Sequence, residues 1–345
     1  MPPVPRVSVI VPVYNRRDAI RPTLDSVSAQ TYADCEVVVV DDGSTDDVLA
    51  MLRADYPNVR TIRLERNSGV SVARNRGVAA AHGELIAFLD SDDLWSPDKL
   101  TLQVEDFDRH PEAVLSFTDI TFGVTGTSFV YSVTQPFQPE RVFEQLLEGG
   151  PILPSAVMVR KSHFDATGGF DPDVTPAEDR DLWLRLAPLG PFRFLPLPLV
   201  RRVVYPDAES RPTERWEASL HRVVARFLDR PEGAPYRDRA GALRAFQFVK
   251  VGSRHLQGAK LFHALTAFSR ATVRDPRALV RPTARRLLAR ACEHHVKRLV
   301  KWSRAARFRR RVGRLFGWSP GLSVKSAVAE PAGEFRPPPD ASSRM

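Results

Sequence analysis

Three short apolar runs, each followed at once by polar residues, dominate the N-terminal part of the chain. They span residues 7–13 (VSVIVPV), 36–40 (EVVVV) and 85–89 (LIAFL). Near-continuous Val and Ile runs are typical of strands that are buried on both faces of a sheet, so we predict three such strands. The polar residues that follow them are Tyr14-Asn15, Asp41-Asp42 and Asp90-Ser91-Asp92-Asp93.

Helical patterns separate these runs. Apolar residues recur at the spacing of one helical face at positions 20, 24 and 27, and again at positions 100, 104 and 107. Strands that alternate with helices indicate an α/β fold with a mostly parallel sheet flanked by helices. The polar strand ends should then converge on one crevice at the carboxyl edge of the sheet, where such folds bind ligands.

The chain divides into four zones. Its 345 residues, 43% of them hydrophobic, suffice for one core and an appendage. We expect a catalytic domain at residues 1–205, which carries all the motifs, and a helical extension at 206–275. Basic amphipathic helices should follow at 276–318, and the proline-rich stretch at 319–345 is predicted to be disordered.

The net positive charge of the chain comes from one segment. Between Arg277 and Arg314 there are fourteen Lys and Arg residues and one acid, Glu293, whereas the whole chain has a net charge of +9. The remainder is therefore mildly acidic, and with no recognised nucleic-acid module we expect no nucleic-acid partner. The apolar residues of this segment recur at helical spacing, which predicts binding to an anionic membrane surface. The alternative is that its apolar face packs on the catalytic domain.

Cysteine content and hydropathy indicate the compartment. Cys35 and Cys292 are far apart and show no metal-ligand spacing, which fits a reducing cytosol. The first residues, MPPVP, lack the basic start of a signal peptide, and no run of 18 apolar residues predicts a transmembrane helix. We therefore expect a cytoplasmic protein that is peripheral at the inner face of the membrane.

The carboxylates that follow residue 89 form the most informative cluster. Asp90, Asp92 and Asp93 crowd the end of a buried strand, where like charges raise one another's pKa. A divalent cation such as Mg²⁺ or Mn²⁺, bound by one or two carboxylates and by substrate phosphates, would relieve this repulsion. The alternative is a polar turn before a helix, in which Ser96 caps the helix and Pro97 takes its first position.

Five segments together resemble a known family. They are VSVIVPVYN (7–15), VVVVDDGSTDD (37–47), RNSGVSVARNRG (66–77), LIAFLDSDD (85–93) and GGFDPDVTPAEDRDLWLRLA (168–187). In order and spacing they resemble the family 2 glycosyltransferases, which have the GT-A nucleotide-binding fold. The resemblance covers residues 7 to about 200. It implies transfer of a sugar from a nucleotide diphosphate donor with inversion at the anomeric carbon.

The resemblance also implies a donor site. Asp42 would accept a hydrogen bond from the uracil ring of a UDP donor, and Arg74 would lie near the base and the Asp42 carboxylate. Asp92 would bind the cation that bridges the diphosphate. The alternatives are that Asp42 caps a helix or turn and that Arg74 lies on a solvated helix face. The expected nucleotide-sugar-binding residues are Pro12, Tyr14, Asn15, Asp42, Arg74, Asn75 and Asp90.

An acidic run at residues 178–181 marks the acceptor side. By resemblance Asp179 would deprotonate the acceptor hydroxyl, with Glu178 in support, although Asp181 is not distinguished from Asp179 by sequence. Acids in a first helical turn are also favoured by the helix dipole, which is the structural alternative. Gly169, Phe170 and Trp183 are expected to contact the acceptor.

These inferences predict a metal-dependent inverting glycosyltransferase. The donor would be a nucleotide-diphospho-sugar, a UDP-sugar by the expected role of Asp42, and the acceptor a glycan or a lipid-linked molecule. The setting would be synthesis of a cell-surface polysaccharide or glycoconjugate. A catalytically inactive, membrane-recruited assembly protein of the same fold is the alternative. A sugar nucleotidyltransferase is a weaker one, because no glycine-rich phosphate loop follows the first strand.

Overall fold

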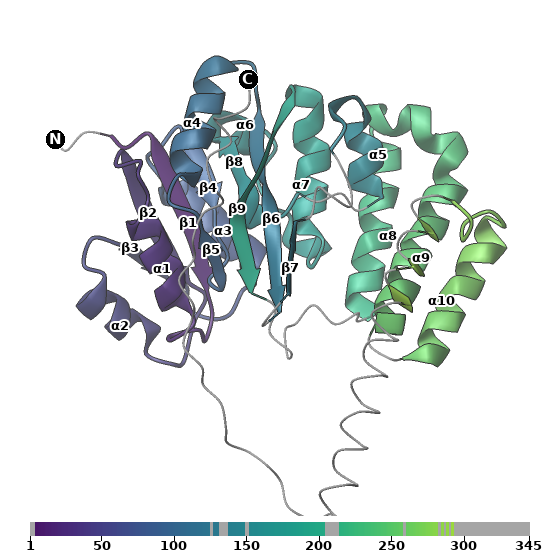
Figure 1. Cartoon of the computed structure of the whole chain (residues 1–345), viewed down its shortest axis with the longest axis horizontal. Helices are drawn as coiled ribbons and strands as arrows, with labels where there is room; N and C mark the ends of the chain where they lie inside the picture. The colour runs from purple at the N-terminus through teal and green to yellow at the C-terminus, as the bar shows by residue number, and fades with distance from the viewer. Residues whose placement is uncertain are drawn as a thin grey trace, which may run out of the picture.

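The computed structural model describes residues 4–124, 127–130, 137–148, 152–203, 214–257, 260–281, 284–285, 288–289 and 291–292 (Figure 1). The strands are β1 Val7–Val13, β2 Cys35–Asp41, β3 Arg60–Arg63, β4 Leu85–Phe88, β5 Asp93–Trp95, β6 Leu115–Val124, β7 Thr127–Val130, β8 Val157–Arg160 and β9 Phe192–Val203. The α-helices are α1 Ile20–Ser28, α2 Val48–Asp55, α3 Val70–Ala80, α4 Lys99–Arg109, α5 Val142–Leu147, α6 Lys161–Ala166, α7 Glu178–Leu186, α8 Glu214–Asp229, α9 Ala240–Gln257 and α10 Leu261–Arg274. Short 3-10 helices include Pro154–Ala156, Pro172–Val174 and Pro231–Arg239.

One mixed sheet forms the centre of the α/β fold. Its strand order is β3-β2-β1-β4-β8-β6-β9-β5, with β7 paired to β6. The strands β3, β2, β1 and β4 are parallel, as predicted. The prediction of a mostly parallel sheet holds only for this part and for the pair β6–β9. The other pairings, β4–β8, β6–β8, β6–β7 and β5–β9, are antiparallel.

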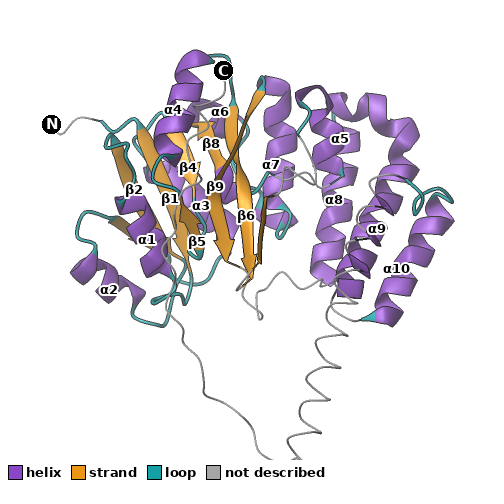
Figure 2. Cartoon of the chain, viewed as in Figure 1, coloured by secondary structure: helices purple, strands orange, loops and turns teal. Residues whose placement is uncertain are grey.

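The alternation of side chains along β1 explains why its apolar run is unbroken. Val9 and Val11 point into one buried cluster, which contains Leu24 of α1 and Phe107 of α4. Ile10 points into the other cluster, on the face that α3 covers. Helices therefore cover both faces of the sheet, as Figure 2 shows, and the predicted two-sided burial is confirmed.

The helix α3 lies unusually close to the sheet. A Cβ at Gly77 would come within 2.4 Å of the Ile10 side chain. A glycine is therefore needed where the helix crosses β1, since any side chain would push the helix away. This close contact fixes the position of α3, the helix that carries Arg74 and Asn75.

The helical extension shares its core with the sheet-containing part. Val223 and Phe227 of α8 belong to the same buried cluster as Trp183 of α7. Figure 1 shows α8, α9 and α10 stacked side by side beyond α7. The domain boundary at residue 205 stays a prediction, although the extension packs directly against the element that carries the acidic run.

Much of the predicted C-terminal organisation lies outside the described residues. Residues 293–345 lie outside the described residues. The greater part of the basic segment and the whole of the predicted disordered tail therefore have no structural account. Among the residues that are described, no helix has the length and apolar character needed to span a membrane.

Candidate active site

The carboxyl ends of β1, β2 and β4 meet at one edge of the sheet, where the sequence predicts the donor site. The central strand β1 pairs with both neighbours, and the amide of Asp42 donates to the carbonyl of Val13 at 2.9 Å. The polar residues that follow the three strands therefore leave the sheet at one edge. Four further segments contribute to this edge: the start of α3, the turn before β5, the Pro154–Ala156 helix and the start of α7.

Asp42 is buried and holds the start of α3. Its two carboxylate oxygens accept hydrogen bonds from the backbone amides of Ser68 (2.7 Å) and Gly69 (2.8 Å). A carboxylate here complements the positive end of the helix. Gly69 has a φ of 92°, a conformation that favours glycine. Asp42 therefore fixes the segment that precedes the first residue of α3, and each of its oxygens keeps a second lone pair for a ligand.

The loop after β1 is tied to the loop after β2. The side-chain oxygen of Asn15 accepts a hydrogen bond from the backbone amide of Thr45 at 2.7 Å. The backbone amide of Asn15 donates to the hydroxyl of Ser44 at 2.9 Å. Pro12 is buried within β1, whereas Tyr14 is 43% exposed. Tyr14 and Asn15 are therefore both accessible to a donor, and Tyr14 has the aromatic ring that could stack on a base.

Arg74 is buried and connects two acids. Its Nη2 donates to Asp90 Oδ1 at 2.6 Å, and its Nη1 donates to Glu178 Oε1 at 3.0 Å. The guanidinium also lies over the ring of Phe170, with 5.1 Å between Cζ and the ring centroid. Backbone amides, rather than Arg74, bind the Asp42 carboxylate, and the expected position of Arg74 near the base and this carboxylate stays a prediction. The alternative of a solvated helix face is wrong, because Arg74 is buried.

The residues Asp90 to Asp93 form a turn rather than the start of a helix. The backbone amide of Asp93 donates to the carbonyl of Asp90 at 3.1 Å, and β5 follows at once. The helix α4 begins only at Lys99, after Asp98, so the alternative in which Ser96 and Pro97 start the helix is wrong by two residues. Pairing of β5 with β9 places Asp93 opposite Arg202, which brings a cation to the turn.

Ser155, in the short Pro154–Ala156 helix before β8, fixes this turn. Its hydroxyl donates to Asp93 Oδ2 at 2.6 Å and accepts from the backbone amide of Asp90 at 3.1 Å. Neither Ser155 nor Arg202 belongs to a recognisable motif, and sequence analysis missed both. They reach the site through contacts between residues far apart in sequence, so no local pattern could have revealed them.

The three carboxylates of the turn differ in their electrostatics. Burial works against ionisation of Asp90, but Arg74 and Arg202 together hold its pKa below the usual range. Burial and the nearby charge of Asp90 raise the pKa of Asp92. The same two causes raise the pKa of Asp93 to about 7. The crowding predicted from the sequence is therefore present. The negative charge of Asp90 disfavours ionisation of Asp92 and Asp93.

Asp92 is the carboxylate best placed to bind a cation. Its side chain is 28% exposed, and Arg16 Nη1 lies 3.7 Å from its Oδ2. Within the described ranges no group of three or more His, Cys, Asp or Glu residues is arranged as a complete metal site. Asp90 is equally exposed, but Arg74 binds its Oδ1 at 2.6 Å. The carboxylate of Asp92 therefore fits Mg²⁺ or Mn²⁺ that takes its other ligands from water and phosphates.

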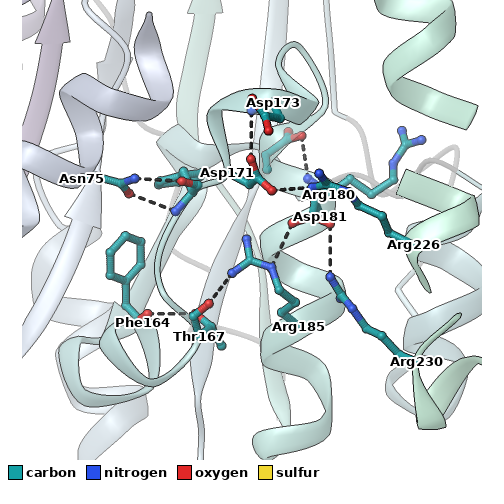
Figure 3. Close-up of polar contacts among 12 residues, drawn as sticks. Asn75, Phe164, Thr167, Asp171, Asp173, Arg180, Asp181, Arg185, Arg226 and Arg230 are labelled. Atoms are coloured by element: carbon teal, nitrogen blue, oxygen red, sulfur yellow. Dashed lines mark hydrogen bonds and ion pairs between the residues drawn. The ribbon is translucent and has the colours of Figure 1, made fainter. Parts of the chain in front are cut away.

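The acidic run at the start of α7 divides into different roles. Asp181 is buried and accepts from Arg185 Nε at 2.8 Å, and Arg230 of α8 lies 3.4 Å from its other oxygen (Figure 3). Asp181 therefore connects α7 to Arg230 of α8 and is not accessible to an acceptor. This separates Asp181 from Asp179, which the sequence left open. Asp179 is half-buried, and its Oδ1 accepts from the backbone amide of Arg180.

Glu178 faces Arg74 of α3. One of its carboxylate oxygens binds Arg74, and the other, Oε2, is buried without a hydrogen-bond partner among the described residues. Burial raises the pKa of Glu178, Arg74 opposes this rise, and Asp179 adds to it. A buried acceptor atom without a partner is costly unless a ligand supplies a hydrogen bond. Glu178 thus lies between Arg74 and the residue predicted to be the base.

The residues predicted to bind the acceptor lie mainly in the core. Phe170 and Trp183 are each 1% exposed, and the Trp183 indole donates to the carbonyl of Ile152 at 2.9 Å. Their side chains pack edge to face with 6.2 Å between ring centroids, so neither can touch an acceptor. The sequence was misleading because aromatic residues of a ligand-binding motif can also lie in the core, where they pack behind the residues that bind the ligand. The expected acceptor contacts of Phe170 and Trp183 are therefore wrong.

Asn75 and Gly169 also serve the architecture. Both ends of the Asn75 amide bind the backbone of Phe170, at 2.7 and 2.9 Å (Figure 3). A Cβ at Gly169 would come within 2.6 Å of Asn75 Oδ1. The Asn75 amide therefore holds this loop, and its expected contact with the donor stays a prediction. Gly169 is required by this close approach and by its φ of 75°.

Comparisons with known proteins identify the family of the chain. The model of Glycosyl transferase family 2 matches residues 8–168. The putative teichuronic acid biosynthesis glycosyltransferase TuaG of Bacillus subtilis is 35% identical over 195 residues, which are 54% of this chain and 73% of TuaG. Some other curated relatives are much longer, and the chain spans 30% of their length.

Solved structures share the fold at low sequence identity. Residues 1–349 of S. aureus TarS, in complex with UDP-GlcNAc, superpose with a TM-score of 0.59 at 21% identity, over 84% of this chain and 89% of that one. The mannosyltransferase PcManGT of Pyrobaculum calidifontis, in complex with GDP-Man and Mn²⁺, gives 0.53 at 21% identity over 87% of each chain. The fold is therefore that of the GT-A glycosyltransferases. The chain belongs to glycosyl transferase family 2.

Proposed function

We propose that the protein is a cation-dependent inverting glycosyltransferase. It would move a sugar from a UDP-sugar to a glycan or lipid-linked acceptor during synthesis of a cell-surface polysaccharide or glycoconjugate. The observation that carries the proposal is the chain of contacts from Asp90 through Arg74 to Glu178, which joins the donor-side turn to the start of α7. The relation to TuaG, which is named for teichuronic acid biosynthesis, supports the polysaccharide setting.

The donor would lie along the carboxyl edge of β1, β2 and β4. The exposed ring of Tyr14 can stack on the base, and the free lone pairs of Asp42 can accept the N–H of uracil. A structural relative crystallised with UDP-GlcNAc supports a uridine donor. Asp90, held ionised by Arg74, can accept hydrogen bonds from the ribose or the sugar.

Asp92 would hold the cation, Mg²⁺ or Mn²⁺. When bound, this cation would act as a Lewis acid on the diphosphate and stabilise the charge of the leaving nucleotide. The support is the accessible carboxylate of Asp92, its raised pKa, and the Mn²⁺ in the complex of PcManGT.

Asp179 would act as the general base. The acceptor hydroxyl oxygen attacks the anomeric carbon on the face opposite the diphosphate, and Asp179 takes the hydroxyl proton. The bond between the anomeric carbon and the diphosphate oxygen breaks, and UDP leaves with the electron pair. This single displacement inverts the anomeric configuration. Asp179 suits the role better than Asp181 because its side chain is half-buried, whereas Asp181 is enclosed by two arginines.

Nucleotide release from a panel of sugar donors tests the proposal. With Mn²⁺ present, the wild-type protein should release UDP from at least one UDP-sugar, and addition of EDTA should stop the release. A folded protein that releases no nucleotide from any donor would contradict the proposal and favour the inactive assembly protein. Formation of pyrophosphate from a nucleoside triphosphate and a sugar phosphate would instead indicate a nucleotidyltransferase.

The basic segment would bring the enzyme to an anionic membrane surface, where lipid-linked acceptors are found. The proposal rests on its charge pattern, since each Lys or Arg near such a surface contributes about 1 kcal/mol. Flotation with anionic liposomes at low salt tests it. The full chain should float, and a chain that ends at Asp275 should not. Equal partitioning of the two would favour packing of the segment on the catalytic part.

A further inference from the structure

The helix α10 exposes large apolar side chains and buries small ones. An ordinary surface helix packs its large apolar residues on the core and presents polar residues to solvent. The buried residues of α10 are instead three alanines, at positions 264, 267 and 271. Four of its large apolar side chains are between 55% and 81% exposed, and we call them the α10 patch: Leu261, Phe262, Leu265 and Val273.

The residues of the α10 patch lie together on one side of the helix. Phe262, Leu265 and Val273 are spaced by three and eight residues, which places them on the same face. Figure 1 shows α10 as the outermost of the three stacked helices of the extension. Other large apolar side chains that the described residues expose, such as Leu189 and Leu197, belong to separate elements. Single exposed apolar residues are common, whereas a contiguous group marks an interaction surface.

The chain around the α10 patch is basic. Residues 260–281 contain five Lys and Arg residues and one acid, Asp275. Lys260 and Arg274 are exposed at the two ends of the helix, and the exposed Arg270 lies 3.3 Å from Glu217 of α8. An apolar face bordered by cations is complementary to a surface that is both apolar and anionic, as a lipid membrane can be. The same face of a second copy would be repelled by these charges.

The described start of the basic segment packs on the opposite side of α10. Ala284 belongs to the same buried cluster as Ala271 of α10, and Ala291 belongs to that of Ala264. Ala264 and Ala271 lie about half a turn away from Phe262 on the helix. This part of the segment therefore runs beside α10 without covering the α10 patch. A surface that attracts the cations of the segment is brought against the same helix.

We propose that the α10 patch inserts into the interfacial layer of an anionic membrane. This inference rests on the membrane setting of the proposed function, and it adds an apolar contact made by the extension to the charge of the basic segment. The helix would lie in the plane of the interface, with Phe262 and Leu265 at the acyl boundary and the neighbouring cations at the headgroups. Ala267 shares a buried cluster with Trp183 of α7, so insertion would also orient the active site relative to the membrane.

Flotation of the full chain with lipid vesicles tests the inference. At low salt the wild-type protein should float with phosphatidylglycerol vesicles and should not float with vesicles of phosphatidylcholine alone. The double variant Phe262→Ser with Leu265→Ser keeps every charge. Its partition coefficient on phosphatidylglycerol should be about 10- to 100-fold lower than that of wild type, because two large side chains no longer leave water on binding.

A matched double variant controls for the loss of two exposed apolar residues. Leu189→Ser with Leu197→Ser changes two exposed leucines outside the extension and should float as wild type does. The inference is overturned if the Phe262 and Leu265 variant also floats as wild type does, or if wild type does not float with the anionic vesicles.

Sedimentation velocity tests a second copy of the chain as the occupant of the α10 patch. We expect wild type and the Phe262 and Leu265 variant to sediment alike. A wild-type dimer that the variant does not form, together with equal flotation of the two proteins, would make the α10 patch a contact between copies and would overturn the inference.

Two further comparisons separate this inference from the proposed function. If the Phe262 and Leu265 variant floats as wild type does but the chain that ends at Asp275 does not float, the inference fails and membrane binding by the basic segment stands. UDP release in the absence of vesicles should be equal in wild type and the variant, because the α10 patch is outside the active site. If neither protein releases a nucleotide, the transferase proposal fails, whereas flotation still decides the role of the α10 patch.

Discussion

Arg74 donates one hydrogen bond to Asp90, 16 residues after it in sequence, and another to Glu178, 104 residues after it. The guanidinium is buried, so the two ion pairs are poorly screened by solvent. Asp90 belongs to the turn proposed to bind the donor, and Glu178 belongs to the helix that carries the proposed base. Arg74 thus connects the two halves of the site physically.

Removal of Arg74 should destabilise the fold strongly. Arg74→Met leaves Asp90 and Glu178 without their shared cation, and breaking a buried ion pair typically costs about 3–5 kcal/mol. Arg74→Lys should recover only part of this loss, since an ammonium cannot present the two separate donor groups of a guanidinium. Urea unfolding at pH 7 measures the change.

The neighbouring exposed arginine is the control for this experiment. Arg76 lies on the outer side of α3, so Arg76→Met should change the free energy of unfolding by no more than about 0.5 kcal/mol. Equal stability of the Arg74→Met and Arg76→Met proteins would contradict the bridging role.

Asn75 should matter for the loop rather than for the donor. Asn75→Ala removes both hydrogen bonds to the backbone of Phe170 and should lower the free energy of unfolding by about 1–3 kcal/mol. UDP affinity, measured by calorimetry, should stay within about twofold, because the hydrogen bonds of Asn75 hold the loop. A twofold change corresponds to less than about 0.5 kcal/mol. Asn67→Ala, at an exposed position before α3, serves as the control. A large loss of UDP affinity with unchanged stability would restore the donor role that the sequence suggested.

Asp92 should make UDP binding depend on the cation. For wild type, replacing Mn²⁺ by EDTA should weaken UDP binding at least about tenfold, or about 1.4 kcal/mol. In Asp92→Asn the two conditions should give nearly the same weak affinity, whereas Asp98→Asn, at an exposed residue before α4, should behave as wild type. Wild-type affinities that are equal with and without the cation would refute the role of Asp92.

His221 of α8 should make the extension sensitive to acid. Burial, followed by the charges of three arginines, Arg274, Arg244 and Arg270, lowers the pKa of His221 to about 4. Below the ordinary histidine pKa of about 6.5 the unfolded chain binds a proton that the folded chain does not, so stability falls as pH drops from 6.5 toward 4.

Comparison of His221→Gln with wild type isolates this effect. Because the ring is only partly buried, we expect the wild-type protein to lose about 1 kcal/mol more than the variant between pH 7 and pH 5. Urea unfolding at both pH values measures the difference. Identical losses would contradict the expectation, because they would mean that His221 takes up a proton equally in the folded and unfolded states.

The sequence predicted the strands and helices well wherever the pattern was local. β1 spans the expected residues 7–13, and the helices with apolar positions 20, 24 and 27 and 100, 104 and 107 are α1 and α4. The mixed character of the sheet was not predictable, because β8 and β9 enter it through pairings between residues distant in sequence. Hydropathy indicates a strand but not its neighbour.

Within the site, sequence identified the important positions more reliably than their contacts. Arg74 and Asp42 both lie at the predicted edge, but their partners within the protein, two acids for Arg74 and two backbone amides for Asp42, were not predicted. Phe170 is part of a motif and yet supports it from the core. Ser155 and Arg202 carry no motif at all. Side-chain partners depend on tertiary packing, which a single sequence does not display.

The central claim is that Asp179 of α7 is the base whereas Asp181 is structural. One kinetic comparison tests this claim most directly. Asp179→Asn should lower kcat for sugar transfer about 10²- to 10⁴-fold, the usual range for loss of a general base, with little change in UDP affinity. Asp181→Asn should instead lower stability, since Arg185 and Arg230 lose their buried partner, while the folded fraction keeps its kcat. Near-normal kcat in Asp179→Asn, together with loss of kcat in stably folded Asp181→Asn, would contradict the account.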